Sequence, residues 1–182
     1  MILKLKKGLV QVYTGNGKGK TSAALGLIMR AMGYGLKVYF VQFLKPPEYF
    51  SGELATLGRF KSQCQVVRCP VYYSLFKPLS AEQRKEWEKA IFNILGEVRE
   101  SMKKNRYDVY VLDEINNCLS KELVSTVEIL DLIRQKPAHV ELVLTGRHAP
   151  LAVIRQADLV TRMEPIKHPF KKGIYARKGI EY

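Results

Sequence analysis

The segment TGNGKGKT, residues Thr14 to Thr21, decides the fold class. It follows the apolar run LVQVYT from Leu9, which is typical of a strand, and it precedes an amphipathic segment with helical spacing. A glycine-rich loop in this setting is typical of a phosphate loop, whose usual pattern places a glycine five positions before the Gly-Lys-Thr ending. Thr14 occupies that position, and the glycine comes one residue later, at Gly15. We therefore predict a phosphate loop with an altered entry.

The chemistry of such a loop is anion binding. The first N–H groups of a helix are unpaired and the helix dipole is positive there, so a phosphate is favoured at that end. The glycines let the chain turn its amides inward. We expect Lys20 to reach phosphate oxygens and the Thr21 hydroxyl to complete the shell of a Mg²⁺ ion. The alternative is a glycine-rich strand-to-helix turn with incidental lysines.

Short apolar runs alternate with helix-length periodic segments along the rest of the chain. This alternation predicts an α/β fold with a mostly parallel sheet and helices on both faces, in a single domain of residues 1–182. The predicted strands start at Leu9, Val38, Val109 and Val140, with two weaker candidates near Val66 and Val160. The predicted helices run from Lys20 to about Tyr34, from the capping residue Ser80 through Met102, and from the capping residue Ser125 to Pro137. The stretches Leu44–Gly52 and Pro70–Leu79 are expected to be functional loops.

The composition narrows the class of protein. The chain has 182 residues, 47% of them hydrophobic, which suits one globular domain. It has no apolar run of membrane-spanning length and no secretory signal, so we expect a cytoplasmic protein that does not bind membranes. Its three cysteines form no CxxC pair, which argues against disulfides and zinc. The net charge of +13 fits a nucleic-acid surface, attraction for phosphorylated molecules, or a solvated exterior.

A magnesium nucleotide also needs a carboxylate partner. The run VYVLDE ends an apolar strand in Asp113 and Glu114, and the carboxyl ends of parallel strands border the ligand crevice of an α/β sheet. A solvated strand end is the alternative. Hydrolysis of a γ-phosphate would further need a residue that orients water, often with an arginine finger. No sequence pattern identifies a residue for either role.

Several segments resemble the corrinoid adenosyltransferases, which transfer the adenosyl group of ATP to cobalt. The resemblance covers most of the chain outside Cys64 to Asn105. Its segments are GNGKGKT with SAALGLIMRAMGYGLKV, VQFLK with SGE, VLDEIN, RQKPAHVELVLTGRHAP and ADLVTRMEPIKHPFKKGIYARKGIEY. The combination is specific, because phosphate-loop proteins at large do not carry these segments in this order.

The resemblance implies a RecA-like fold, a homodimer, ATP with Mg²⁺, a corrinoid substrate and a flavoprotein reductant. In the reaction it implies, cobalt(I) attacks the 5′ carbon of ribose and inorganic triphosphate leaves, so the loop grips a leaving group and no general base is needed. It implies catalytic roles for Lys20, Thr21 and Glu114, and a Mg²⁺ site made by Thr21 with Glu114 or Asp113. The implied nucleotide contacts are Gly15, Asn16, Gly17, Lys18, Gly19, Lys20, Thr21, Arg30 and Arg147. The KHPF segment, Lys167 to Phe170, is expected to order a lid or an interface.

The chain departs from the family at one point. Family members commonly carry a Phe-Thr-Trp stretch whose aromatic rings crowd the lower face of the corrin, where this chain has CPVYYSLFKP, Cys69 to Pro78. Wide aromatic faces suit an apolar macrocycle. Tyr72, Tyr73 and Phe76 are therefore candidates for corrinoid contacts, and plain packing is the equal alternative.

Two other functions compete with adenosyl transfer. A RecA-like ATPase that binds nucleic acid is favoured by the net charge and by lysine clusters at both ends of the chain. The absence of an aromatic–basic RNA-binding motif argues against it. A nucleotide-binding regulator without catalysis is favoured by the altered corrinoid stretch.

Overall fold

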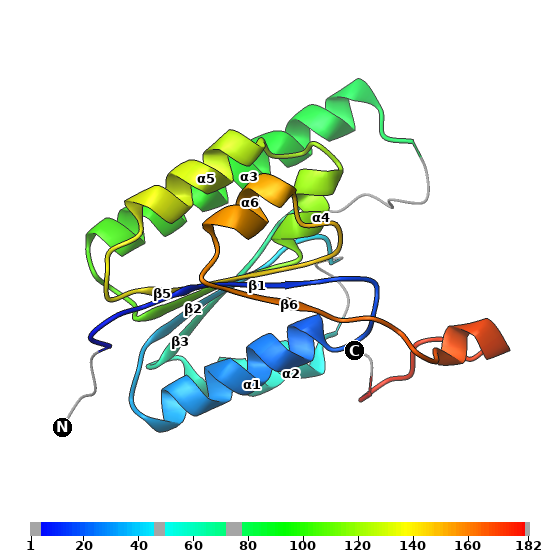
Figure 1. The fold of residues 1–182 in the computed structure, drawn as a ribbon, viewed down its shortest axis with the longest axis horizontal. Helices are drawn as coiled ribbons and strands as arrows, with labels where there is room; N and C mark the ends of the chain where they lie inside the picture. The colour runs from blue at the N-terminus through cyan, green and yellow to red at the C-terminus, as the bar shows by residue number, and fades with distance from the viewer. Residues whose placement is uncertain (1–4, 46–49, 72–77, 181–182) are drawn as a thin grey trace.

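Six parallel strands form the centre of the computed structural model, which describes residues 5–45, 50–71 and 78–180 (Figure 1). The strand order is β3-β2-β4-β5-β1-β6. Their bounds are Val10–Thr14 (β1), Val38–Gln42 (β2), Cys64–Arg68 (β3), Val109–Asp113 (β4), Glu141–Thr145 (β5) and Leu159–Arg162 (β6). The mostly parallel α/β sheet expected from the sequence is thereby confirmed.

Helices cover both faces of the sheet and create two hydrophobic layers (Figure 1). One face carries α1 (Lys20–Gly33) and α2 (Gly52–Leu57), followed by the short helix η1 (Gly58–Phe60). The opposite face carries α3 (Ala81–Lys103), α4 (Ile115–Ser120), α5 (Thr126–Gln135) and α6 (Leu151–Gln156). Every residue of β2, β4 and β5 is buried, as expected for parallel strands enclosed between two helical layers.

The predicted helix starts are confirmed in detail. Ser80 accepts a hydrogen bond from the backbone of Gln83, and the Gln83 side chain accepts from the Ser80 backbone, which completes a capping box for α3. Ser125 and Glu128 form the same reciprocal pair for α5. The two weaker strands also form, and they are the sheet's edges. All four residues of β6 are exposed, which explains its weak sequence signal.

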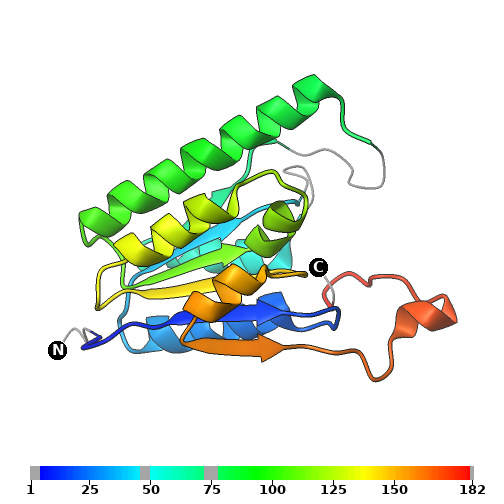
Figure 2. The same cartoon turned by 45° about the horizontal axis from the view of Figure 1, so that its top comes forward.

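The short elements were not predicted. Helices α2, α4 and α6 have six residues each, too few for a helical period to stand out. Helix α2 begins at the last residue of the predicted loop Leu44–Gly52. After β6 the chain extends past the sheet edge and contains the short helix η2 (Pro169–Lys172), which Figure 2 shows well away from the sheet. Among the described residues, the helices lack the combined length and apolar character needed to span a bilayer.

The topology determines where a site can form. Strand β1 lies between β5 and β6, and β4 lies between β2 and β5. Because all six strands are parallel, the loops after β1, β2, β4 and β5 all leave the sheet at the carboxyl ends of the strands. Ligands bind at this end of open α/β sheets.

Candidate active site

The loop between β1 and α1 is held against the chain that leaves β6. Gly15 has a φ angle of 93°, which residues with side chains rarely adopt. A Cβ atom on Gly15 would lie 2.4 Å from the carbonyl oxygen of Met163, and one on Gly17 would lie 2.8 Å from it. The amide of Gly17 donates to that same oxygen at 2.7 Å. Both glycines are therefore required, because the backbone after β6 packs directly on the loop.

Lys20 lies inside the loop that precedes it. Its Nζ donates to the carbonyl oxygens of Gly15, at 2.8 Å, and Gly17, at 2.6 Å. The residue is only 7% exposed. Burial lowers the pKa of the ammonium, while the charge of Glu114 acts in the opposite direction. The lysine thus holds the loop's curvature and carries a positive charge at the start of α1, where a phosphate is favoured.

Thr21 and Asp113 meet at the carboxyl edge of the sheet. The Thr21 hydroxyl donates to Asp113 Oδ1 at 2.9 Å, and the Thr145 hydroxyl donates to the same oxygen at 2.7 Å. The other oxygen, Oδ2, is buried without a hydrogen-bond partner in the part of the chain that the structure describes. A buried carboxylate oxygen without a donor needs an explanation, and a cation is one.

Glu114 lies beside Asp113 in an unusual backbone conformation. Its φ angle is 67°, in the left-handed region, and its amide donates to the Thr145 hydroxyl at 2.9 Å. Burial raises the pKa of Glu114 to about 7, and the neighbouring charge of Asp113 adds to the rise. Burial likewise raises the pKa of Asp113, against the hydrogen bonds from Thr145 and Thr21. Burial disfavours the ionised form of both adjacent carboxyl groups, and a cation bound beside them would favour that form.

Arg147 reaches the same region from the loop after β5. Its backbone amide donates to Asn117 Oδ1 at 2.6 Å, and the Asn117 amide group donates to Glu114 Oε2. Asn117 therefore connects the carboxylate after β4 to the arginine after β5. The guanidinium is exposed, which leaves it accessible to a ligand. The asparagine is a residue that sequence reasoning missed, although it directly follows the VLDEIN segment.

A second missed group lies after β2. Lys45 Nζ and Glu53 Oε1 form an ion pair at 2.8 Å, and Gln42 Nε2 donates to the same carboxylate oxygen at 3.3 Å. Burial would raise the pKa of Glu53, but the hydrogen bonds from Lys45 and the backbone outweigh it and lower the pKa to about 2. Two sequence signals mark these residues: the segments VQFLK and SGE contributed to the family resemblance, and Lys45 lies in the predicted functional loop Leu44–Gly52.

One cavity of about 930 Å³ connects these groups with the chain after β6. The phosphate loop, Glu114, Arg147, Lys45 and Glu53 line one side of it, and residues between Glu164 and Ile180 line the other. Its lining contains six Lys or Arg side chains and three Glu side chains, so the lining favours an anion. The basic residues are Lys18, Lys20, Lys45, Arg147, Lys167 and Arg177, and the acidic ones are Glu53, Glu114 and Glu164.

Not every predicted contact is brought to this cavity. Asn16, Lys18, Gly19 and the KHPF segment line it. Arg30 is an exposed residue in the last turn of α1, and it is absent from the cavity lining. Its assignment as a nucleotide contact therefore stays a prediction. The three candidate corrinoid contacts, Tyr72, Tyr73 and Phe76, lie outside the described residues.

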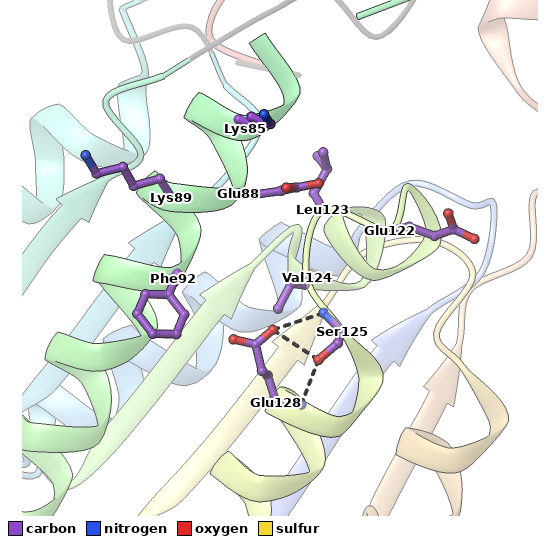
Figure 3. A pocket seen from close by; sticks show the side chains of 9 residues that line it. All are labelled: Lys85, Glu88, Lys89, Phe92, Glu122, Leu123, Val124, Ser125 and Glu128. Atoms are coloured by element: carbon purple, nitrogen blue, oxygen red, sulfur yellow. Dashed lines mark hydrogen bonds between the residues drawn. The ribbon is translucent and has the colours of Figure 1, made fainter. Parts of the chain in front are cut away.

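A second hollow, of about 410 Å³, lies between α3 and the connection from α4 to α5 (Figure 3). Lys85, Glu88, Lys89 and Phe92 of α3 line one side of it, and Ser125 and Glu128 lie on the other. The dashed lines in Figure 3 show that Ser125 and Glu128 are bonded to each other in the capping box. Its lining includes no glycine loop, so the larger cavity is the candidate active site.

The sheet order, the two helical layers and the glycine loop after β1 define a RecA-like α/β protein of the P-loop class. Solved structures agree with this fold. A KaiC-like protein from Pyrococcus horikoshii superposes with a TM-score of 0.59 and 17% identity, over 88% of this chain and 75% of that one. The flagellar accessory protein FlaH from Methanocaldococcus jannaschii gives a TM-score of 0.57 and 16% identity, over 87% and 72%. Identities this low show the fold alone.

The chain belongs to the family of ATP:corrinoid adenosyltransferases. Residues 6–182 match the family described as ATP:corrinoid adenosyltransferase BtuR/CobO/CobP. Corrinoid adenosyltransferases from a Sinorhizobium species and from Pseudomonas aeruginosa are each 35% identical over 97% of this chain, and over 81% and 85% of their own lengths. The relative from Escherichia coli K12 is 29% identical over 97% of the chain. The protein is therefore a transferase acting on ATP and a corrinoid, and the ATPase and regulator alternatives are not favoured.

Proposed function

We propose that the phosphate loop holds the triphosphate of ATP while the 5′-deoxyadenosyl group passes to cobalt(I) of a corrinoid, in adenosylcobalamin synthesis or salvage. The observation that carries this placement is the contact between Thr21 and Asp113. It puts the hydroxyl after the glycine loop directly against a buried carboxylate that keeps one oxygen without a donor. The amides proposed to bind phosphate and the oxygens proposed to bind the metal therefore lie together at the carboxyl ends of the strands.

These oxygens fit Mg²⁺. The donor set would be the Thr21 hydroxyl with Asp113 Oδ2 or the Glu114 carboxylate, all hard oxygen ligands of the kind this ion prefers. Among residues 5–45, 50–71 and 78–180, no cluster of three or more Asp, Glu, His or Cys side chains is positioned to hold a metal ion. The remaining ligands would then be water and substrate phosphates, which is the usual manner of magnesium binding in nucleotide sites. Bound there, Mg²⁺ would neutralise charge on the triphosphate.

The residues of the chain then act on a leaving group. The electron pair of cobalt(I) forms the bond to the 5′ carbon, the bond from that carbon to the ester oxygen breaks, and its electron pair leaves on the triphosphate. Lys20 stabilises this growing negative charge by exchanging its bonds to the carbonyls of Gly15 and Gly17 for phosphate oxygens. Loop amides contribute in the same way, except that of Gly17, which is bonded to Met163. The balance requires no proton transfer, so the carboxyl groups are left to bind the metal.

The other finer assignments belong to the same proposal. Arg147 contacts the nucleotide from the β5 side, where its guanidinium is exposed next to Glu114. Tyr72, Tyr73 and Phe76 contact the lower face of the corrin, and Arg30 contacts the nucleotide. The enzyme acts as a cytoplasmic homodimer whose single domain spans residues 1–182, and a flavoprotein supplies the electrons for cobalt(I). These assignments rest on the family and on the residue types.

The products test the proposal. The purified protein is incubated with ATP, Mg²⁺ and chemically reduced cobalamin, and adenosylcobalamin is followed by its absorption spectrum while the phosphates are separated by ion exchange. Inorganic triphosphate should appear in a one-to-one ratio with adenosylcobalamin. Release of ADP and phosphate in that ratio would instead show that the loop serves phosphoryl transfer to water.

A further inference from the structure

The ion pair between Lys45 and Glu53 lies next to the candidate metal-binding carboxylates. Gln42, the last residue of β2, is paired in register with Asp113, the last residue of β4. Its Nε2 donates to Glu53 Oε1 at 3.3 Å, and Lys45 Nζ donates to that oxygen at 2.8 Å. One carboxylate oxygen thus receives two donors from the end of β2, and Gln42 is fully buried. Gln42 therefore orients the Glu53 carboxylate, and this carboxylate orients the Lys45 ammonium.

This pair differs from an ordinary surface salt bridge. The Glu53 side chain is 13% exposed and that of Lys45 is 30% exposed. Taking charges partly out of water costs free energy, so a partly buried pair is weak support for stability alone. Exposed pairs elsewhere in the chain, such as Lys103 with Glu100, need no such explanation because they stay in water. Because stability alone does not explain this partly buried pair, we expect its role to lie in the cavity that it lines.

The position of Lys45 suggests that role. Lys45 and Glu53 line the same cavity as the phosphate loop. The loop follows β1, and β2 lies three strands away across β5 and β4, about 14 Å at the usual strand spacing. The contact between Thr21 and Asp113 lies between them. Lys45 is therefore a cation across the candidate metal-binding carboxylates from Lys20, and its charge lowers the pKa of both Asp113 and Glu114.

We propose that Lys45 is a further substrate-contacting residue, whose ammonium binds the triphosphate of ATP from the side opposite the phosphate loop, and that Glu53 is the residue that positions it. The inference rests on the proposed placement of the triphosphate at that loop. Lysine is suited to this contact, because its ammonium is a compact charge with three donors on a flexible stem. Among the described residues, one of these donors is held by Glu53, and the other two can reach phosphate oxygens. During the reaction the same ammonium adds to the stabilisation of charge on the departing triphosphate.

The test measures binding of inorganic tripolyphosphate with Mg²⁺ by calorimetry, so that no corrinoid chemistry is involved. Lys45→Met keeps the apolar stem and removes the charge. The matched control is Lys37→Met, because Lys37 is exposed and directly precedes β2, at the strand end away from the cavity. We expect affinity to fall about 10- to 100-fold for Lys45→Met, as for loss of a charged hydrogen bond, and less than twofold for Lys37→Met. Lys45→Arg should keep affinity within about threefold of the wild type.

Two further arms make the result decisive. Lys20→Ala separates this inference from the placement on which it rests: if it binds tripolyphosphate as the wild type does, the placement fails, whereas equal affinity of Lys45→Met and wild type overturns only the role of Lys45. Glu53→Gln separates positioning from simple charge. Removal of a negative charge should by itself tighten binding of an anion, so weaker binding by Glu53→Gln supports positioning, and tighter binding overturns it. Thermal unfolding of each variant checks that it is folded.

Discussion

Replacement of Glu114 by glutamine should stabilise the protein at alkaline pH in the absence of divalent cations. Burial raises the pKa of this carboxyl group to about 7, from an ordinary value of 4.5. The folded state therefore prefers the protonated form. The stability that this preference contributes is fully present below pH 4.5, and it is lost as the pH rises through about 7. A glutamine keeps the shape and the hydrogen-bonding oxygen but cannot ionise.

The size of the effect follows from the pKa interval. Between 4.5 and about 7, at about 1.4 kcal/mol per pH unit, the folded wild type loses about 3 kcal/mol of unfolding free energy relative to the variant. In a protein of this length, 3 kcal/mol corresponds to roughly 6–12 °C in Tm. The left-handed backbone conformation at position 114 is the same in both proteins, so its strain cancels in the comparison.

Urea unfolding at pH 5.0, 6.5 and 8.0, with a chelator present, measures this difference. The advantage of Glu114→Gln over the wild type should be small at pH 5.0 and largest at pH 8.0. Glu122→Gln is the matched control, because Glu122 also has a positive φ angle but is exposed; its difference should stay within about 0.5 kcal/mol at all three values. A Glu114→Gln advantage that does not grow with pH would refute the reasoning. Added Mg²⁺ with tripolyphosphate should then stabilise the wild type more than the variant.

Three other predictions concern the loop and the corrinoid stretch. Lys20→Ala should weaken ATP binding at least tenfold in calorimetry with little change in circular dichroism, because it removes the charge proposed to bind the phosphates and leaves the hydrophobic core intact. Unchanged affinity would exclude the phosphate-loop assignment. Gly17→Ala should abolish ATP binding and lower the Tm, since its Cβ would lie 2.8 Å from the carbonyl oxygen of Met163; a variant with wild-type affinity and Tm would show that the loop can move away. Single alanine substitutions of Tyr72, Tyr73 and Phe76 should leave ATP affinity nearly unchanged. At least one of them should reduce the spectroscopic signature of four-coordinate cobalt(II) corrinoid. Persistence of this signature in all three variants would mean that the rings do not contact the corrinoid.

The sequence by itself determined the phosphate loop, the alternation of strands and helices, and the family. These features are local: a glycine run between a strand and a helix, capping boxes at Ser80 and Ser125, and apolar runs of strand length can all be recognised within a few residues. The placement of Asp113 at the end of a buried strand was equally readable, because carboxyl ends of parallel strands share one edge.

The tertiary structure decided how these pieces meet. Only the pairing of β1 with β6 shows that Met163 closes the glycine loop, and only the register of β2 with β4 places Gln42 beside Asp113. The ion pair joins Lys45, which follows β2, to Glu53 of α2, eight residues further along the chain. Such contacts depend on strand order and register across the whole chain, which no local pattern encodes. The sequence therefore identifies the chemistry of the site, while the order and register of the strands determine which residues surround it.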